Sequence, residues 1–149
     1  MNIRLYKVVF DESASNIDDL YSYLSDIDKQ KILHLEITSS FHCYHNENYC
    51  GYILITPKSM KDYKNVLSNN LIPYLCEDLS TDVIDNKINL EEELFKYTDH
   101  SNYKDYDDFI LQMNVWILEN LNLDLILDRI SLRGIDSLRP IDKEFLKTI

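Results

Sequence analysis

Two histidines and two cysteines fall close together in the segment FHCYHNENYC, which spans residues 41–50. His42, Cys43, His45 and Cys50 are all of types that bind zinc, and paired cysteines also form disulfides. Structural zinc sites use four ligands in tetrahedral geometry, commonly supplied by two short paired spacings. The chain has no second such pair, so a metal site, a disulfide and an ordinary β-hairpin are weighed here.

The pairing register of this predicted hairpin decides among the three. A four-residue loop would pair Cys43 with Cys50, whereas a five-residue loop at 45–49 pairs Phe41 with Ile53. Only the longer loop gathers the aliphatic side chains of both strands on one face, and each buried one contributes roughly 1.5–3 kcal/mol. We therefore expect the two cysteines to point to opposite faces, with no disulfide, metal or cofactor.

The opposite face of the predicted sheet is polar. His34 and Glu36 would be neighbours there, as an acid/base pair requires, but no nucleophile accompanies them and we assign no catalytic residue. This face is an open ligand surface, a dimer face or a surface covered by C-terminal helices. Its candidate ligand-binding residues are His34, Glu36, His42, Tyr44 and Tyr52.

The elements that position these residues follow from periodicity. Alternation predicts strands, and recurrence at three and four residues predicts helices. Their order, β-α-β-β-α-β, predicts an α+β fold of ferredoxin-like type with an antiparallel sheet over residues 1–80. Pro73 places the last strand at an edge. The predicted strands are 2–10, 31–44, 50–56 and 71–80, and the predicted helices are 16–28 and 58–70.

Residues 81–149 are predicted to be helical and to pack on the sheet, so that residues 1–149 form one domain. Helices are expected near 89–97 and over 106–121. The second is apolar over more than half its circumference, because Leu111, Val115 and Leu118 widen the main stripe. We expect it to be a central helix buried by more than one neighbour. Its main stripe is Tyr106, Phe109, Ile110, Met113, Trp116, Ile117 and Leu121.

The net charge of −11 is concentrated in residues 76–108, which hold 3 lysines and 11 acidic residues. Such a segment repels nucleic acid and anionic lipid and attracts basic proteins. The alternative is a solvated face that only aids solubility. The candidate partner-binding residues are Glu77, Asp78, Asp82, Asp85, Glu91, Glu92, Glu93, Asp105, Asp107 and Asp108.

The N-terminal residues lack the apolar run of a signal peptide, and no stretch reaches the ~18 apolar residues needed to span a bilayer. We therefore expect a cytoplasmic protein that does not bind membranes. The three cysteines, Cys43, Cys50 and Cys76, should be reduced in that compartment.

The C-terminal segment carries a family resemblance. DRIS at 128–131, Gly134 in a turn, SL at 137–138 and EFL at 144–146 resemble a helical tail found after the membrane domain of some bacterial rhomboid-type proteases. The resemblance covers about a sixth of the chain, residues 123–146.

The segment departs from that pattern at 139–141, where acidic residues and threonine are usual. The resemblance implies a helical hairpin and not protease activity, because no membrane domain is expected here. Gly134 is a predicted helix C-cap, Ser137 a predicted N-cap, and Pro140 falls early in the next helix.

In overall character the chain is similar to bacterial toxin immunity proteins, being small, acidic and rich in tyrosine. We therefore expect a non-catalytic inhibitor that binds a basic toxin, with nucleases as one such class. The free chain is a monomer or has an oligomeric state that the sequence does not define. Acidic surfaces speed association with basic partners, and tyrosines supply contacts at low entropic cost. The alternatives are a small enzyme or ligand-binding domain using the His34, Glu36 and His42 face, and a phage or mobile-element anti-defence protein.

Overall fold

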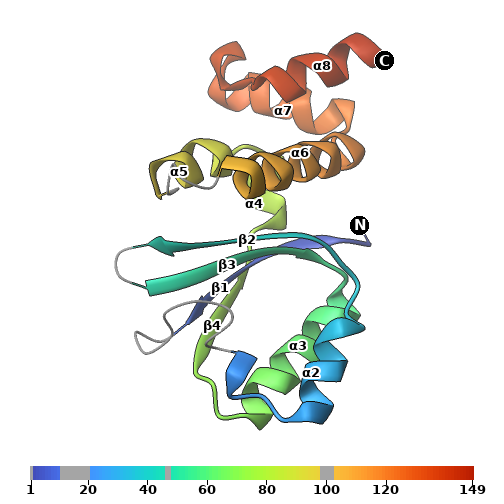
Figure 1. Cartoon of the computed structure of the whole chain (residues 1–149). Helices are drawn as coiled ribbons and strands as arrows, with labels where there is room; N and C mark the ends of the chain where they lie inside the picture. The colour runs from blue at the N-terminus through green and yellow to red at the C-terminus, as the bar shows by residue number, and fades with distance from the viewer. Residues whose placement is uncertain (1, 11–20, 46–47, 98–102) are drawn as a thin grey trace.

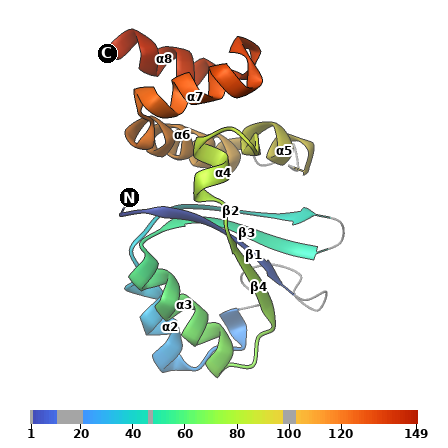
Figure 2. The same cartoon turned by 180° about the vertical axis from the view of Figure 1, so that it is seen from behind.

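The computed structural model describes residues 2–10, 21–45, 48–97 and 103–149. A four-stranded antiparallel sheet forms the middle of the molecule, with helices on both of its faces. Helices α2 and α3 cover one face, and α4, α5 and α6 lie over the other (Figure 1). Helices α7 and α8 stack beyond α6, which is clear again from behind (Figure 2).

The sheet has the strand order β2-β3-β1-β4. Strand β1 pairs antiparallel with both β3 and β4, and β2 pairs antiparallel with β3. Strands β1 and β2 therefore run parallel with β3 between them, and β3 and β4 run parallel with β1 between them. Strand β4 lies at an edge, as Pro73 predicted. The strands are β1 (Arg4–Phe10), β2 (Ile37–His45), β3 (Asn48–Ile55) and β4 (Tyr74–Asp78).

The predicted hairpin register is wrong. Cys43 lies opposite Cys50 and His45 opposite Asn48, so residues 46–47 alone connect the strands. The prediction assumed one apolar face, but helices bury both faces of this sheet. Ile53 is therefore as well buried on the face of His42 as it would be on the other.

Two apolar clusters lie on the two faces. On the α4–α6 side, β-strand residues such as Leu5, Phe41 and Leu54 pack against α6. On the α3 side, Val8 and Ile53 belong to a cluster with residues of α3. The expected cover of one face by the C-terminal helices is thus present, but the residues beneath it are mostly apolar.

Helix α3 (Pro57–Asn69) matches its prediction, whereas α2 (Asp26–Leu33) does not. The sequence predicted a helix over 16–28 and a strand from residue 31. The start of that predicted helix lies outside the described residues. Helix α2 shows Ile27 to solvent with 72% of its surface exposed and instead buries Asp28. The Asn70 side chain donates to that carboxylate at 2.7 Å, so polar contacts hold this helix and apolar periodicity does not reveal it.

Helix α6 (Tyr103–Asn120) is buried along its predicted stripe. Trp116 is 4% exposed, and its indole Nε1 donates to the Ile3 carbonyl at 2.8 Å, which ties α6 to the start of the sheet. The expected burial of α6 by more than one neighbour is incomplete, because Leu111 and Val115 on its wider apolar side stay 61% and 44% exposed. Helices α4 (Ser80–Ile84) and α5 (Leu90–Tyr97) lead into it.

The C-terminal segment forms the predicted helical hairpin of α7 (Leu123–Arg133) and α8 (Pro140–Thr148). Gly134 follows α7 with φ of +81°, and its N–H donates to Ile130 at 2.8 Å, as expected for a C-cap. Ser137 is not the N-cap. It ends a short 3₁₀ turn, and Arg139 is the residue before α8.

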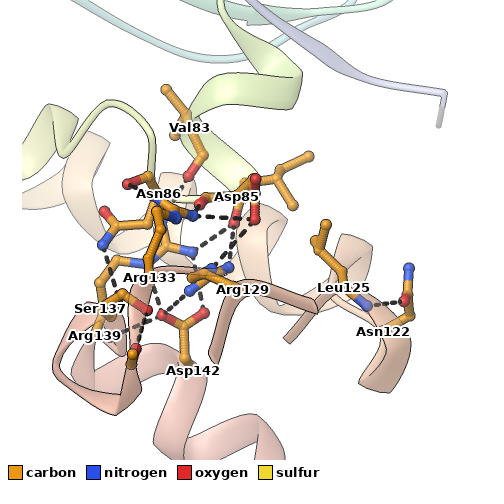
Figure 3. Close-up of polar contacts among 12 residues, drawn as sticks. Val83, Asp85, Asn86, Asn122, Leu125, Arg129, Arg133, Ser137, Arg139 and Asp142 are labelled. Atoms are coloured by element: carbon orange, nitrogen blue, oxygen red, sulfur yellow. Dashed lines mark hydrogen bonds and ion pairs between the residues drawn. The ribbon is translucent and has the colours of Figure 1, made fainter. Parts of the chain in front are cut away.

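Three arginines fasten this hairpin to the end of α4 (Figure 3). Arg129 is fully buried and donates to Asp142 at 2.6 Å, to Asp85 at 3.2 Å and to the Ile84 carbonyl at 3.1 Å. Arg139 also donates to Asp142 and to the carbonyls of Val83 and Ile84 in α4. Arg133 donates to the carbonyls of Asp85 and Asn86, which directly follow α4. Burial opposes ionisation of Asp142, but the Arg139 and Arg129 contacts outweigh it and lower the pKa of Asp142.

Candidate protein-binding surface

The ten predicted partner-binding carboxylates do not form one surface. Glu77 and Asp78 belong to β4, Asp82 and Asp85 lie at α4, and the other six come from α5 and the start of α6. Asp78 forms an ion pair with Arg4, and Asp85 forms ion pairs with two arginines of α7. These two carboxylates serve the fold.

The pKa of Asp78 shows the same structural role. Burial alone would raise it, but hydrogen bonds from Ser80 and Arg4 and the arginine charge lower it. The Ser80 N–H donates to Asp78 at 2.9 Å at the start of α4. This carboxylate therefore accepts from the first N–H of α4 and pairs with Arg4 of the neighbouring strand β1, so its interactions lie within the fold.

The first turn of helix α5 contains three consecutive glutamates, Glu91 to Glu93. The Asn89 side chain accepts from the Glu92 N–H at 3.2 Å, so it caps the helix, and acidic residues in a first turn complement the helix dipole. Glu91 and Glu92 are exposed, and Glu93 is half-buried. Neither exposed glutamate forms an ion pair within the part of the chain that the structure describes.

The start of α6 lies against α5 and adds further charge. The Tyr106 hydroxyl donates to the Glu91 carbonyl at 3.1 Å, and the Phe95 and Tyr106 rings meet edge to face at 6.3 Å. Burial raises the pKa of Tyr106, and the charges of Glu91 and Asp107 raise it further. Glu91 and Asp107 therefore act on the same hydroxyl.

A hollow of about 320 Å³ opens between these two helices. Asn89, Glu91 and Glu92 line it together with Phe95, which is 54% exposed, and Tyr106. We call the set of Glu91, Glu92, Phe95, Tyr106 and Asp107 the α5–α6 acidic surface. It combines exposed carboxylates with an exposed aromatic ring.

A second hollow, of about 460 Å³, adjoins the first and shares Asn89 and Glu91 with it. We call it the α6–α8 groove. Sequence reasoning missed it, although the wide apolar stripe of α6 was its signal. It is lined by Asn89, Glu91, Leu111, Asn114, Val115, Leu118, Arg139, Pro140, Ile141 and Glu144.

Asp105 and Asp108 lie apart from these two hollows. With Ser39 to His42 and Tyr49 they line a hollow of about 430 Å³ beside β2, one of the two edge strands of the sheet. Both carboxylates are exposed. The acidic start of α6 thus extends from the α5–α6 acidic surface to the β2 edge of the sheet.

The predicted ligand face is not assembled. His34 is the residue after α2 and Glu36 lies in the following link, so neither belongs to a strand. Tyr44 is 48% exposed near the hairpin tip. Tyr52 points to the α6 side, whereas His42 stacks on Tyr49 of the α3-side cluster.

His42 is a packing residue. Its ring lies 5.7 Å from that of Tyr49 with an interplanar angle of 16°, and a Cβ at Gly51 would come within 2.9 Å of it. Its Nε2 is buried without a hydrogen-bond partner among the described residues. Burial lowers the pKa of His42 to about 4.

Cys43 and Cys50 point to the same face, which corrects the expectation of opposite faces. Cys43 and Cys50 are buried and Cys76 is half-buried, and none of these three forms a disulfide. Burial, with a smaller contribution from Cys50, raises the pKa of Cys43 to about 12. The Cys43 thiol therefore stays protonated and is a poor nucleophile at neutral pH.

Among the described residues, no group of three or more His, Cys, Asp or Glu side chains is placed to hold a metal ion. The side chain of His45 lies outside what the structure describes. No described helix is both long and apolar enough to cross a membrane.

Comparison of the chain with protein-family models, curated proteins and solved structures gives no significant match. The likeness to a rhomboid-protease tail and the immunity-protein character therefore stay predictions. The helical hairpin at 123–148 stands on its own geometry.

Proposed function

We propose that the chain binds a basic protein through the α5–α6 acidic surface. One observation carries this proposal. Glu91 and Glu92 are exposed, form no ion pair with described residues, and border a hollow that contains the half-exposed ring of Phe95. Exposed carboxylates steer a basic partner, and an aromatic side chain beside them offers an anchor that loses water on binding.

The negative local charge supports a positively charged partner. Residues 90–97 and 103–108 together hold six carboxylates and two lysines. Nucleic acid and anionic lipid would be repelled here, while a basic protein would be attracted. We infer that the partner is a bacterial toxin and that the chain is its non-catalytic, cytoplasmic immunity protein.

The scaffold alone does not indicate a function. We infer that residues 1–80 adopt the ferredoxin-like arrangement, because each of two parallel strand pairs encloses a strand of the other pair. That fold hosts many activities, so the function is argued from the surface instead. A phage or mobile-element anti-defence protein would use the same surface on a different basic target, and the identity of the captured partner distinguishes the two roles.

The test removes two carboxylates at the surface and two elsewhere. Glu92→Gln with Asp107→Asn changes exposed residues of the α5–α6 acidic surface. Glu36→Gln with Asp62→Asn is the matched control, because both residues are exposed, lie before β2 and on α3, and carry the same charge. The tagged full chain captures its partner from lysate, and the purified partner is then titrated at several salt concentrations.

The surface variant should slow association by about three-fold or more at low salt and flatten its salt dependence, because exposed charges act over roughly 10 Å. The control should change the rate by less than ~1.5-fold, since its residues lie outside the steering surface. Equal effects of both variants would show that acidity acts only through net charge, and would contradict the proposal.

A further inference from the structure

The α6–α8 groove exposes an apolar ridge that the fold leaves uncovered. Leu111, Val115 and Leu118 follow one another at spacings of four and three residues on α6, and Ile141 and Pro140 of α8 form the other wall. The ridge spans roughly 10 Å, or about two helical turns, at 1.5 Å per residue. Leu111 and Val115 are among the more exposed large apolar side chains of this helix.

The charges at the groove are negative once intrachain pairing is counted. Glu91 and Glu144 line it and are exposed. Arg139 also lines it, but its guanidinium donates to Asp142 and to the carbonyls of Val83 and Ile84. The groove therefore presents two exposed carboxylates beside the apolar ridge of α6.

We propose that the α6–α8 groove binds one cationic amphipathic helix of the partner. This inference rests on the proposed function and names the part of the partner that is recognised. A helix laid along a groove presents apolar side chains at i, i+3, i+4 and i+7, which matches the spacing of the ridge. Lysines or arginines flanking its apolar stripe would meet Glu91 and Glu144.

Charge complementarity decides against a second copy of this chain as the occupant. Each copy has a net charge of −11. Two chains that each carry this net charge repel one another, which opposes association of a second copy at the groove. A basic helix instead gains from steering and from burial of the ridge.

The probe is a synthetic 18-residue peptide with leucines at the helical spacing and lysines at the remaining positions. Two control peptides accompany it: one has the same composition in an order without helical periodicity, and one has glutamate in place of lysine. Binding to the full-length chain is measured by fluorescence anisotropy. The periodic lysine peptide should bind at least about ten-fold more tightly than either control.

Two matched variants locate the binding. Leu111→Asn with Val115→Asn replaces the two exposed apolar side chains of the ridge without changing charge or the buried core. Leu127→Asn with Leu132→Asn is the control, because both leucines are exposed on α7 and neither lines the groove. The ridge variant should weaken binding at least about ten-fold, and the control should change it less than about two-fold.

Equal binding of the periodic and reordered peptides, or equal losses in both variants, would overturn the inference. Glu92→Gln with Asp107→Asn separates it from the proposed function, since neither residue lines the groove. If that pair slows association of the captured partner while the ridge variant does not weaken it, the acidic surface stands and the helix inference fails. If only the ridge variant matters, the proposed function fails.

Discussion

His42 lies over Gly51 and against Tyr49, where its Nε2 is buried. Its pKa falls to about 4 because burial disfavours the charged imidazolium. The ring is therefore neutral at pH 7 and acts as a flat packing surface, which Gly51 accommodates by having no side chain. The residue that drew attention as a metal ligand in the sequence is a structural one.

This burial predicts a pH-dependent stability. An unfolded histidine has a pKa of about 6.5, so between roughly pH 4 and 6.5 the unfolded chain binds a proton that folded His42 does not. The stabilisation is complete above that window and is lost as the pH falls through it. Between pH 7 and pH 5, the free energy of unfolding measured with urea should fall by about 2 kcal/mol more in the wild type than in His42→Gln.

The exposed His34 supplies the control, and His34→Gln should keep the full loss of stability in this window. If wild type and His42→Gln show the same pH dependence, His42 is solvated and its packing role is wrong.

At the scale of elements, helix α4 is held by arginines from elsewhere in the chain. The last carbonyls of a helix lack intrahelical partners, and positive charge there complements the helix dipole. Arg129, Arg133 and Arg139 donate to the carbonyls of Ile84, Asp85 and their neighbours. The short helix α4 is thus the point at which the α7–α8 hairpin attaches.

Arg129→Ala should destabilise the protein by about 3–5 kcal/mol, because it leaves buried Asp142 with one fewer cation and removes one hydrogen bond to the Ile84 carbonyl. Hydrogen exchange should rise first in residues 123–148 while the sheet stays protected. Arg133→Ala is the control, since Arg133 is partly exposed and should cost no more than about 1 kcal/mol. Equal costs, or simultaneous exchange of the sheet, would contradict this attachment.

The helices that sequence predicted are those with strong apolar periodicity. Helices α3, α5 and α6 lie where the pattern placed them, within a few residues. The bounds of helix α2 were not predicted, because its buried residue is Asp28 and the side chains of Ile27 and Leu33 face solvent. Periodicity reports burial of apolar side chains and is silent where a helix is held by an asparagine and a capping serine.

The hairpin register was predicted wrongly for a related reason. Apolar side chains fix a register only when one face is buried and the other is wet. Here Phe41 and Tyr52 face one helical layer, and Ile53 and Tyr49 face the other. The sequence of the two strands alone allows both registers, and the structure uses the one with two connecting residues.

At the scale of the whole molecule, two helical layers enclose the sheet and a further hairpin extends the upper one (Figure 1). The composition located the acidic segment, but it did not indicate which of its carboxylates are available to bind a partner. Asp78 and Asp85 proved to be ion-paired within the fold, which depends on Arg4 and Arg129 from distant positions in the chain. The α6–α8 groove likewise depends on how far α8 covers α6, and sequence spacing does not determine that.

The central claim, that a basic partner binds across α5 and α6, is tested most directly by hydrogen exchange of the full chain with and without the captured partner. Protection should increase in residues 90–97 and 103–118, with residues 140–146 following if the partner's helix occupies the groove. Helices α2 and α3, on the other face of the sheet, should be unchanged. Protection confined to α2 and α3, with α5 and α6 exchanging as in the free chain, would contradict the account.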